Sequence, residues 1–163
     1  MLIRTRLILA CGLLASMAGA AFAQNDGIKF FHLDFVVREV DNGKVINARH
    51  YWTTMGTGDR GCSIRTGSKI PVPIGPGSTS YSYADVGVNI DCNTPLEVDG
   101  NLTMNLVAEV SSVASSQNPP VIRQNKWNSK VIVPLNKNTL VFSSDDLASK
   151  GQIQVELTAT AVK

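Results

Sequence analysis

Two histidines and an aspartate come closest to a metal-ligand set in this chain. His32, Asp34 and His50 fall on two segments that are predicted to be neighbouring strands, where their side chains can approach one another. The His-Glu-x-x-His spacing with which a helix presents two histidines to zinc is missing. We therefore interpret the three residues as exposed polar positions of a hairpin, and we expect no metal and no other cofactor.

Hydroxyl and carboxylate groups do not form a recognisable catalytic set either. No Gly-x-Ser-x-Gly motif presents a serine nucleophile, and the serines gather in predicted loops. Asp145 and Asp146 are adjacent and point apart in an extended chain, so we expect them to cap a turn. The glycine-rich turns at 56–58 and 75–77 neither open a helix nor carry a Walker lysine. We therefore expect no enzymatic activity.

Five aromatic residues offer a different chemistry, a stacking platform for a sugar or a peptide. They are Tyr51, Trp52, Tyr81, Tyr83 and Trp127. In β proteins such rings more often fill or flank the core, so the platform is the alternative interpretation. It would make the protein a soluble periplasmic or secreted β-sandwich that binds carbohydrate or peptide. Burial of both tryptophans would exclude it.

The first 23 residues have the layout of a secretory signal peptide. Basic residues, an apolar stretch and a small-residue cleavage site follow one another, at Arg4, Arg6, 7–17, Ala21 and Ala23. Cleavage before Gln24 would leave a single β domain at 24–163. We therefore expect a periplasmic or outer-membrane-associated protein, with release from the cell as a further option.

The charge of the mature domain excludes one class of partner. The chain of 163 residues has 15 Lys and Arg and 13 Asp and Glu, so losing Arg4 and Arg6 with the signal makes the domain formally neutral. We expect no nucleic-acid binding, because that function needs a basic surface. Membrane association stays open, because strands that cross an outer membrane leave only a weak sequence signal.

Two of the three cysteines remain after cleavage, since Cys11 lies in the signal segment. Cys62 and Cys92 have neither Cys-x-x-Cys spacing nor a histidine cluster beside them, which disfavours a metal or reactive thiol pair. An even pair in an exported protein favours a disulfide. The bond would close a loop of about thirty residues and stabilise the fold by roughly 3 kcal/mol.

Apolar and polar residues alternate with a period of two along most of the mature chain, which predicts strands. The pattern is clearest at 81–113, where two strands flank Asp99-Gly100, and Asn42-Gly43 marks another hairpin. Strands are expected at 28–40, 44–55, 60–70, 121–135, 139–142 and 152–162, with loops at 71–80 and 114–120 and a helical turn within 143–150. The predicted fold class is all-β, an antiparallel sandwich or open barrel of about eight strands.

Short motifs follow one another in a fixed order between residues 60 and 142. Their residues are Gly67, Pro71, Tyr83, Asp85, Val86, Gly87, Glu109, Ser111, Pro120 and Arg123. In this order they resemble the β region of the outer-membrane secretins of type II and type III secretion systems. The resemblance implies a β domain that acts through protein–protein contact at the cell envelope, with a secretion-complex protein or another copy as partner.

The chain also departs from the secretin pattern. The ring-building domains that precede this region in secretins have no counterpart in the sequence. The glycine-rich motif that follows the last strand in secretins is replaced by the polar residues 143–146. The cysteine pair, which the family does not require, lies inside the matched region. These departures favour a stable module over a pore.

Overall fold

The computed structural model of this protein describes residues 27–115, 119–145 and 151–162. All regular elements in these ranges are strands, so the predicted all-β class is confirmed. They are β1 (Phe30–Asp41), β2 (Lys44–Gly56), β3 (Gly61–Pro73), β4 (Tyr81–Val98), β5 (Asn101–Ser115), β6 (Val121–Pro134), β7 (Thr139–Asp145) and β8 (Gly151–Ala161). Within the same ranges no helix is long and apolar enough to cross a membrane. The predicted signal peptide at 1–23 lies outside the described residues.

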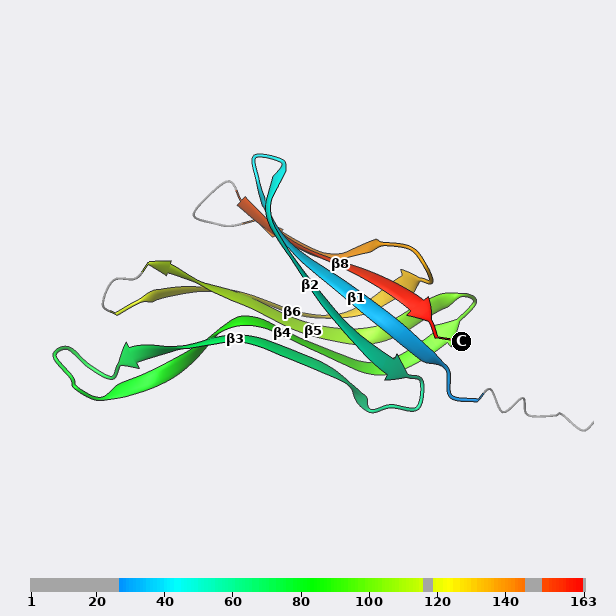
Figure 1. Cartoon of the computed structure of the whole chain (residues 1–163), viewed down its shortest axis with the longest axis horizontal. Helices are drawn as coiled ribbons and strands as arrows, with labels where there is room; N and C mark the ends of the chain where they lie inside the picture. The colour runs from blue at the N-terminus through cyan, green and yellow to red at the C-terminus, as the bar shows by residue number, and fades with distance from the viewer. Residues whose placement is uncertain (1–26, 116–118, 146–150, 163) are drawn as a thin grey trace, which may run out of the picture.

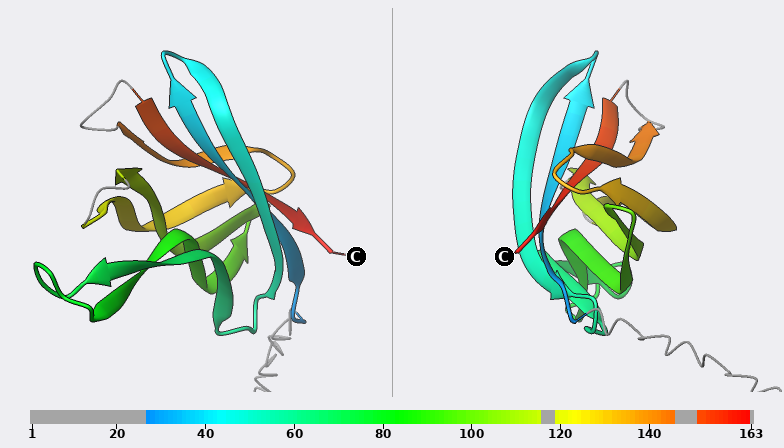
Figure 2. Two further views of the ribbon diagram at one scale, coloured as in Figure 1. Left: turned by 60° about the vertical axis from the view of Figure 1, so that its left-hand side comes forward. Right: turned by 90° about the vertical axis from the view of Figure 1, so that its right-hand side faces the viewer.

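The strands form two antiparallel sheets packed face to face, which confirms the predicted sandwich (Figure 1). The first sheet has the strand order β2-β1-β8-β7 and the second has the order β3-β4-β5-β6. The chain crosses from one sheet to the other at two corners, where β2 leads into β3 and β6 leads into β7. Their strands cross at a wide angle, so the ends of the second sheet extend past the first (Figures 1 and 2).

The core lies between the two sheets and is built from alternate residues of the inner strands. Phe31, Leu33 and Phe35 of β1 are fully buried, as the period-two pattern predicts. They face the second sheet, which contributes a matching set from β4, β5 and β6. The members are Val88, Ile90, Cys92, Leu102, Met104, Leu106, Ala108, Val131 and Val133.

The two predicted hairpin turns are confirmed. Asn42 and Gly43 have φ angles of 47° and 77°, and Asp99 and Gly100 have φ angles of 50° and 73°. Two consecutive left-handed residues give the turn whose twist matches that of the strands on either side. Asn and Asp at the first position and Gly at the second tolerate this conformation best, which is why these dipeptides could be recognised in the sequence.

Three strands extend into segments that were predicted to be a loop or a helical turn, and other boundaries differ by one or two residues. β3 runs on to Pro73 although a loop was expected from residue 71. β3 is an edge strand, and the missing N–H groups of Pro71 and Pro73 face its open side, so the ladder with β4 is intact. Likewise β5 continues to Ser115 and β7 to Asp145.

Asp145 is the last residue of β7, and the residues whose N–H groups it is expected to cap lie outside the described residues. Its carboxylate accepts a hydrogen bond of 2.7 Å from the Gln152 side chain on the paired strand β8. This cross-strand contact supports a strand rather than a helical turn at 143–145. The remainder of the predicted helical turn, with Asp146, lies outside the described residues.

Candidate functional site

The second sheet divides into two hairpin arms at one end, the left end in Figure 1. β4 and β5 pair with each other only as far as Val88 and Val110. Beyond that point, among the described residues, β4 pairs with β3 alone and β5 pairs with β6 alone. We call residues 67–87 the first arm, residues 111–115 together with 119–125 the second arm, and their point of divergence the fork.

A pair of glycines lies at the root of the first arm. Gly67 of β3 stands directly opposite Gly87 of β4. A Cβ atom on Gly67 would collide with the Val86 carbonyl oxygen, and one on Gly87 would collide with the carbonyl oxygen of Thr66. Gly87 also has a φ angle of 152° that other residues rarely adopt. The two backbones therefore approach at the fork as closely as they do only because both residues lack a side chain.

A buried serine joins the two arms at the fork. Ser111 is only 8% exposed. The Gly87 N–H donates a hydrogen bond of 3.0 Å to the Ser111 hydroxyl, which in turn donates to the Gly87 carbonyl oxygen over 3.4 Å. At Gly87 the backbone of β4 no longer pairs with the backbone of β5. The Ser111 side chain instead provides hydrogen-bond partners for the Gly87 N–H and carbonyl groups. Gly67, Gly87 and Ser111, three of the secretin-like motif residues, meet in this one cluster.

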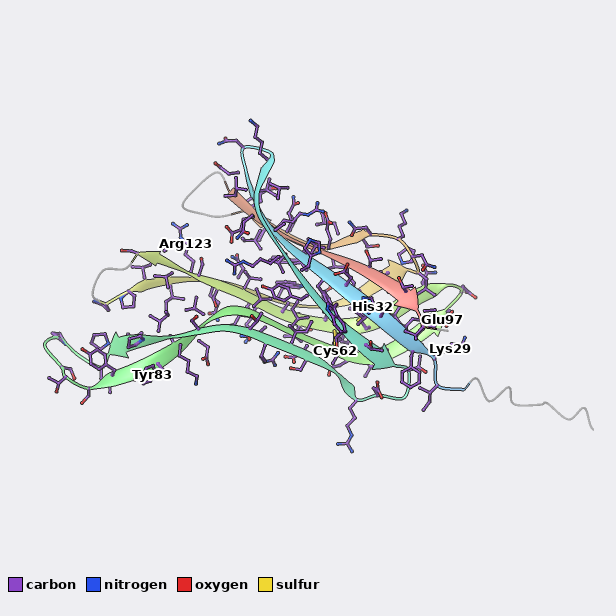
Figure 3. The ribbon with its side chains drawn as sticks, in the orientation of Figure 1. Lys29, His32, Cys62, Tyr83, Glu97 and Arg123 are labelled. Atoms are coloured by element: carbon purple, nitrogen blue, oxygen red, sulfur yellow. A yellow bond between two sulfur atoms is a disulfide. The ribbon has the colours of Figure 1, made fainter. Side chains whose placement is uncertain are left out.

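The other motif residues lie along the strands on either side of the fork. Pro71 pairs with Tyr83 on the first arm. Nearby, Asp85 lies 3.8 Å from Lys69 in an exposed ion pair that contributes little stability. Val86 lies on the same arm, next to Gly87. Glu109 lies beside the fork, 3.9 Å from Lys126. Pro120 and Arg123 belong to the second arm. Figure 3 shows Tyr83 and Arg123 on separate arms, far from Lys29 and Glu97. A shared role for these residues remains a prediction.

The predicted disulfide is confirmed and lies on the core side of the fork. Cys62 and Cys92 occupy opposite positions of β3 and β4, with their Cα atoms 4.9 Å apart. Cys92 is fully buried in the core. Between the disulfide and the glycine pair, Arg65 donates two hydrogen bonds of 2.7 and 2.8 Å to the carboxylate of Asp91. The base of the first arm is therefore fixed, whereas its outer part is held by β3–β4 pairing and by exposed polar contacts such as the Lys69–Asp85 ion pair.

A cleft of about 800 Å³ lies between the second arm and the end of the first sheet. Its aliphatic lining comes from both sheets, with Val37, Val40 and Ile153 on one side and Val88, Val110 and Val113 on the other. Sequence reasoning did not find this cleft. Alternation identifies the inner face of each strand, but it carries no information on where two crossing sheets part.

The structure separates the two histidines. His32 lies opposite Thr54 across the β1–β2 pair, whereas His50 lies opposite Val36. The histidines are thus offset by four positions, or about 13 Å of strand. His32 instead contacts the ring of Trp52, with 5.5 Å between the centroids. The described residues contain no group of three or more His, Cys, Asp or Glu side chains that could hold a metal ion.

The five aromatic residues do not form one platform. Trp52 is 69% exposed on β2, and Tyr51 beside it packs toward the core. Trp127 stacks on Phe142, with ring centroids 3.8 Å apart, and its indole N–H is buried without a hydrogen-bond partner. Tyr81 and Tyr83 lie on the first arm. Trp52 is exposed, so burial of both tryptophans does not exclude an aromatic platform. The dispersal of the aromatic residues over different strands nevertheless argues against a shared stacking surface.

Comparison with known proteins finds similarity in structure only. No protein-family model and no curated protein sequence matches the chain. Similar solved structures include the type II secretion system secretin GspD of E. coli K12 (13% identity, TM-score 0.47, 83% of this chain and 48% of that chain). Others are InvG of the Salmonella SPI-1 injectisome (10%, 0.48, 83% and 62%) and ExeD of Aeromonas hydrophila (12%, 0.49, 83% and 47%).

The chain matches about half of the length of GspD and ExeD. The likeness to these secretins is one of fold.

Proposed function

We propose that the mature domain is an exported, non-enzymatic β module that acts by protein–protein contact at the bacterial envelope. It associates edge to edge with further copies of itself or with a protein of a secretion complex. The secretin-like motif order supports a role beside protein secretion, and the predicted signal peptide supports a periplasmic or outer-membrane location. The observation that carries the proposal is the matched pair of open edges on each sheet.

Strand number and direction make these edges compatible with one another. Each sheet has four strands, all antiparallel to their neighbours, so its two edge strands run in opposite directions. When copies related by a rotation stand side by side, β7 of one copy meets β2 of the next in the antiparallel sense. β6 of one copy meets β3 of the next in the same way.

A single neighbouring copy could pair with an edge strand of each of the two sheets. The edge strands β2 and β3 are joined at one corner of the sandwich, and the edge strands β6 and β7 are joined at another, so each flank carries one edge strand of each sheet. The first sheet also exposes large aliphatic side chains on both of its edge strands, namely Val45 and Ile46 on β2 and Leu140 on β7. Exposed apolar edge strands favour pairing with another chain over a monomeric state.

Light scattering after size-exclusion chromatography of the mature chain, residues 24–163, tests the proposal. We expect oligomers, and chemical crosslinks between β7 of one copy and β2 of the next. The double substitution Val45→Lys and Leu140→Lys should shift the protein to a monomer, because it places charge on both edges that meet. Thr160→Lys is the matched control, since it adds a charge at an exposed position of the central strand β8. A strict monomer that also crosslinks to no envelope protein contradicts the proposal.

A second function, peptide binding, has a separate structural basis in the cleft beside the second arm. Binding of a sugar on an aromatic platform has none, because the aromatic residues are dispersed. The edge strands β2 and β7 contribute to the lining of the cleft, but Val45 and Leu140 do not line it, so the two activities are separable by substitution at these residues.

A further inference from the structure

We propose that the cleft takes up an extended peptide segment of a partner protein and adds it as a strand to β5 at the fork. The segment has aliphatic side chains at alternate positions and one carboxylate. This site goes beyond self-association, because it uses neither β2 nor β7 as a pairing edge. Three features of the fork and the cleft carry the proposal: a strand edge, an apolar lining and an unpaired cation.

The strand edge belongs to the second arm. Residues 111–114 of β5 pair only with β6 among the described residues, because β4 leaves β5 after Val88. Unpaired backbone groups on such an edge accept an added strand. β4 and β5 are antiparallel, so a single added strand can be antiparallel to only one of the two arms. An antiparallel strand on β5 occupies the place that β4 leaves and runs beneath the cleft.

The apolar lining matches the side chains of such a strand. Side chains of a strand point alternately to its two faces, so every second residue of the added segment enters the cleft. There they meet Val88 and Val110 of the second sheet and Val37 and Ile153 of the first. Aliphatic side chains therefore suit the inward positions, while backbone hydrogen bonds to β5 hold the segment without regard to sequence.

Arg49 in the cleft indicates which polar side chain the bound peptide should carry. Arg49 lines the cleft, opposite Val37 on the neighbouring strand, and has no ion-pair or hydrogen-bond partner within the described ranges. The acidic groups of the cleft are already engaged: Glu39 accepts from Asn47 over 3.3 Å, and Asp145 accepts from the Gln152 amide. These amides are neutral and both carboxylates keep their charge, but the Arg49 guanidinium has donors that no described residue uses. Arg49 can therefore donate hydrogen bonds to a carboxylate on the occupant.

Fluorescence anisotropy with labelled synthetic peptides tests the site on the mature chain. The parent peptide alternates Val with Thr and carries one central Asp, and a second peptide carries Lys in place of Asp. We expect saturable binding with a preference for the Asp peptide. Arg49→Gln should weaken binding of the Asp peptide about threefold and remove the preference, because an exposed ion pair contributes only modestly to binding. Arg60→Gln, at an exposed arginine outside the cleft, is the control and should change nothing.

N-methylated peptides test whether the segment adds as a strand. Methyl groups on the amides of one alternate set of residues block the hydrogen bonds to β5, whereas methyl groups on the other set face away. We expect one methylated peptide to lose binding and the other to retain it. Equal binding of both, equal loss of both, or absence of saturable binding overturns the proposal.

Two further variants separate this site from self-association. Val113→Asn should weaken peptide binding severalfold, whereas Ile132→Asn, at an exposed aliphatic residue of β6 outside the cleft, should not. The double variant Val45→Lys and Leu140→Lys should retain peptide binding even where it abolishes oligomers. Loss of binding in that variant, or a disulfide-linked dimer of Arg49→Cys through the cleft, would assign the cleft to a second copy and overturn the proposal.

Discussion

The packed end and the forked end of the second sheet are made from the same strands and differ in what holds them. At the packed end, Cys92 and Leu106 are fully buried against the first sheet. At the forked end, Tyr83 is 67% exposed, and β4 and β5 no longer pair. A single strand can therefore contribute to the core over one half of its length and offer free backbone groups over the other. Stability and binding capacity are located in different halves of this sheet.

The largest difference between the ends should appear on truncating an aromatic side chain. Phe35→Ala removes a fully buried ring from the core and should lower the free energy of unfolding by about 3–5 kcal/mol. Tyr83→Ala on the first arm should cost less than about 1 kcal/mol, because the ring is mostly exposed. Urea denaturation of both variants measures this. Equal losses would mean that the first arm is part of the core.

Removing the disulfide should have the next largest effect. The double substitution Cys62→Ala and Cys92→Ala should cost about 3–4 kcal/mol, because it frees a loop with a sequence separation of 30 in the unfolded chain. Thermal unfolding with and without a reductant measures the loss. The wild type under reducing conditions is the internal control, and it should approach the double variant. Equal stability with and without reductant would contradict a structural role of the bond.

The glycine pair at the fork should tolerate no side chain. Gly87→Ala places a Cβ against the carbonyl oxygen of Thr66 at a positive φ angle and should cost about 2 kcal/mol. Gly75→Ala in the loop of the first arm is the matched control, since its Cβ would meet no atom within 4 Å. We expect that variant to stay within about 0.5 kcal/mol of the wild type. If both variants are equally stable, the close approach of the two strands is not maintained in solution.

The smallest expected effect is at Ser111. Ser111→Ala leaves the Gly87 N–H without its side-chain acceptor and should cost about 1–2 kcal/mol. Hydrogen exchange localises the change, because the Gly87 amide should lose protection while amides of the core keep theirs. Ser112→Ala, at the exposed neighbouring position, should leave the exchange of Gly87 unchanged. Unaltered protection of Gly87 in Ser111→Ala would show that the hydroxyl does not close the fork.

The fold was largely predictable because its signals are local. Asn42-Gly43 and Asp99-Gly100 specify turns through their own backbone preferences, and Phe31 and Leu33 reveal their face through alternation alone. The cysteine pair was predictable because only Cys62 and Cys92 were left to join.

The fork and the cleft were not predictable, because they depend on contacts between distant segments. The alternation of β4 continues through Gly87 without interruption, and nothing near Ser111 indicates that the two strands separate there. The prolines of β3 predict a loop, because an inner strand does not accommodate proline. An edge strand does, but the sequence does not show which strands lie at the edge of a sheet. The same limit applies to Arg49, whose position in the cleft follows from how the two sheets cross.

Pro71 and Pro73 also set a limit on assembly. A chain that pairs with the open side of β3 needs N–H donors from β3, and the last one before the prolines is Lys69, because donors alternate between the two sides of a strand. The two prolines thus limit the length over which a neighbouring strand can pair with this edge. In the proposed assembly, this would confine the pairing of a neighbouring copy with β3 to the part of the strand before Pro71, which includes Cys62.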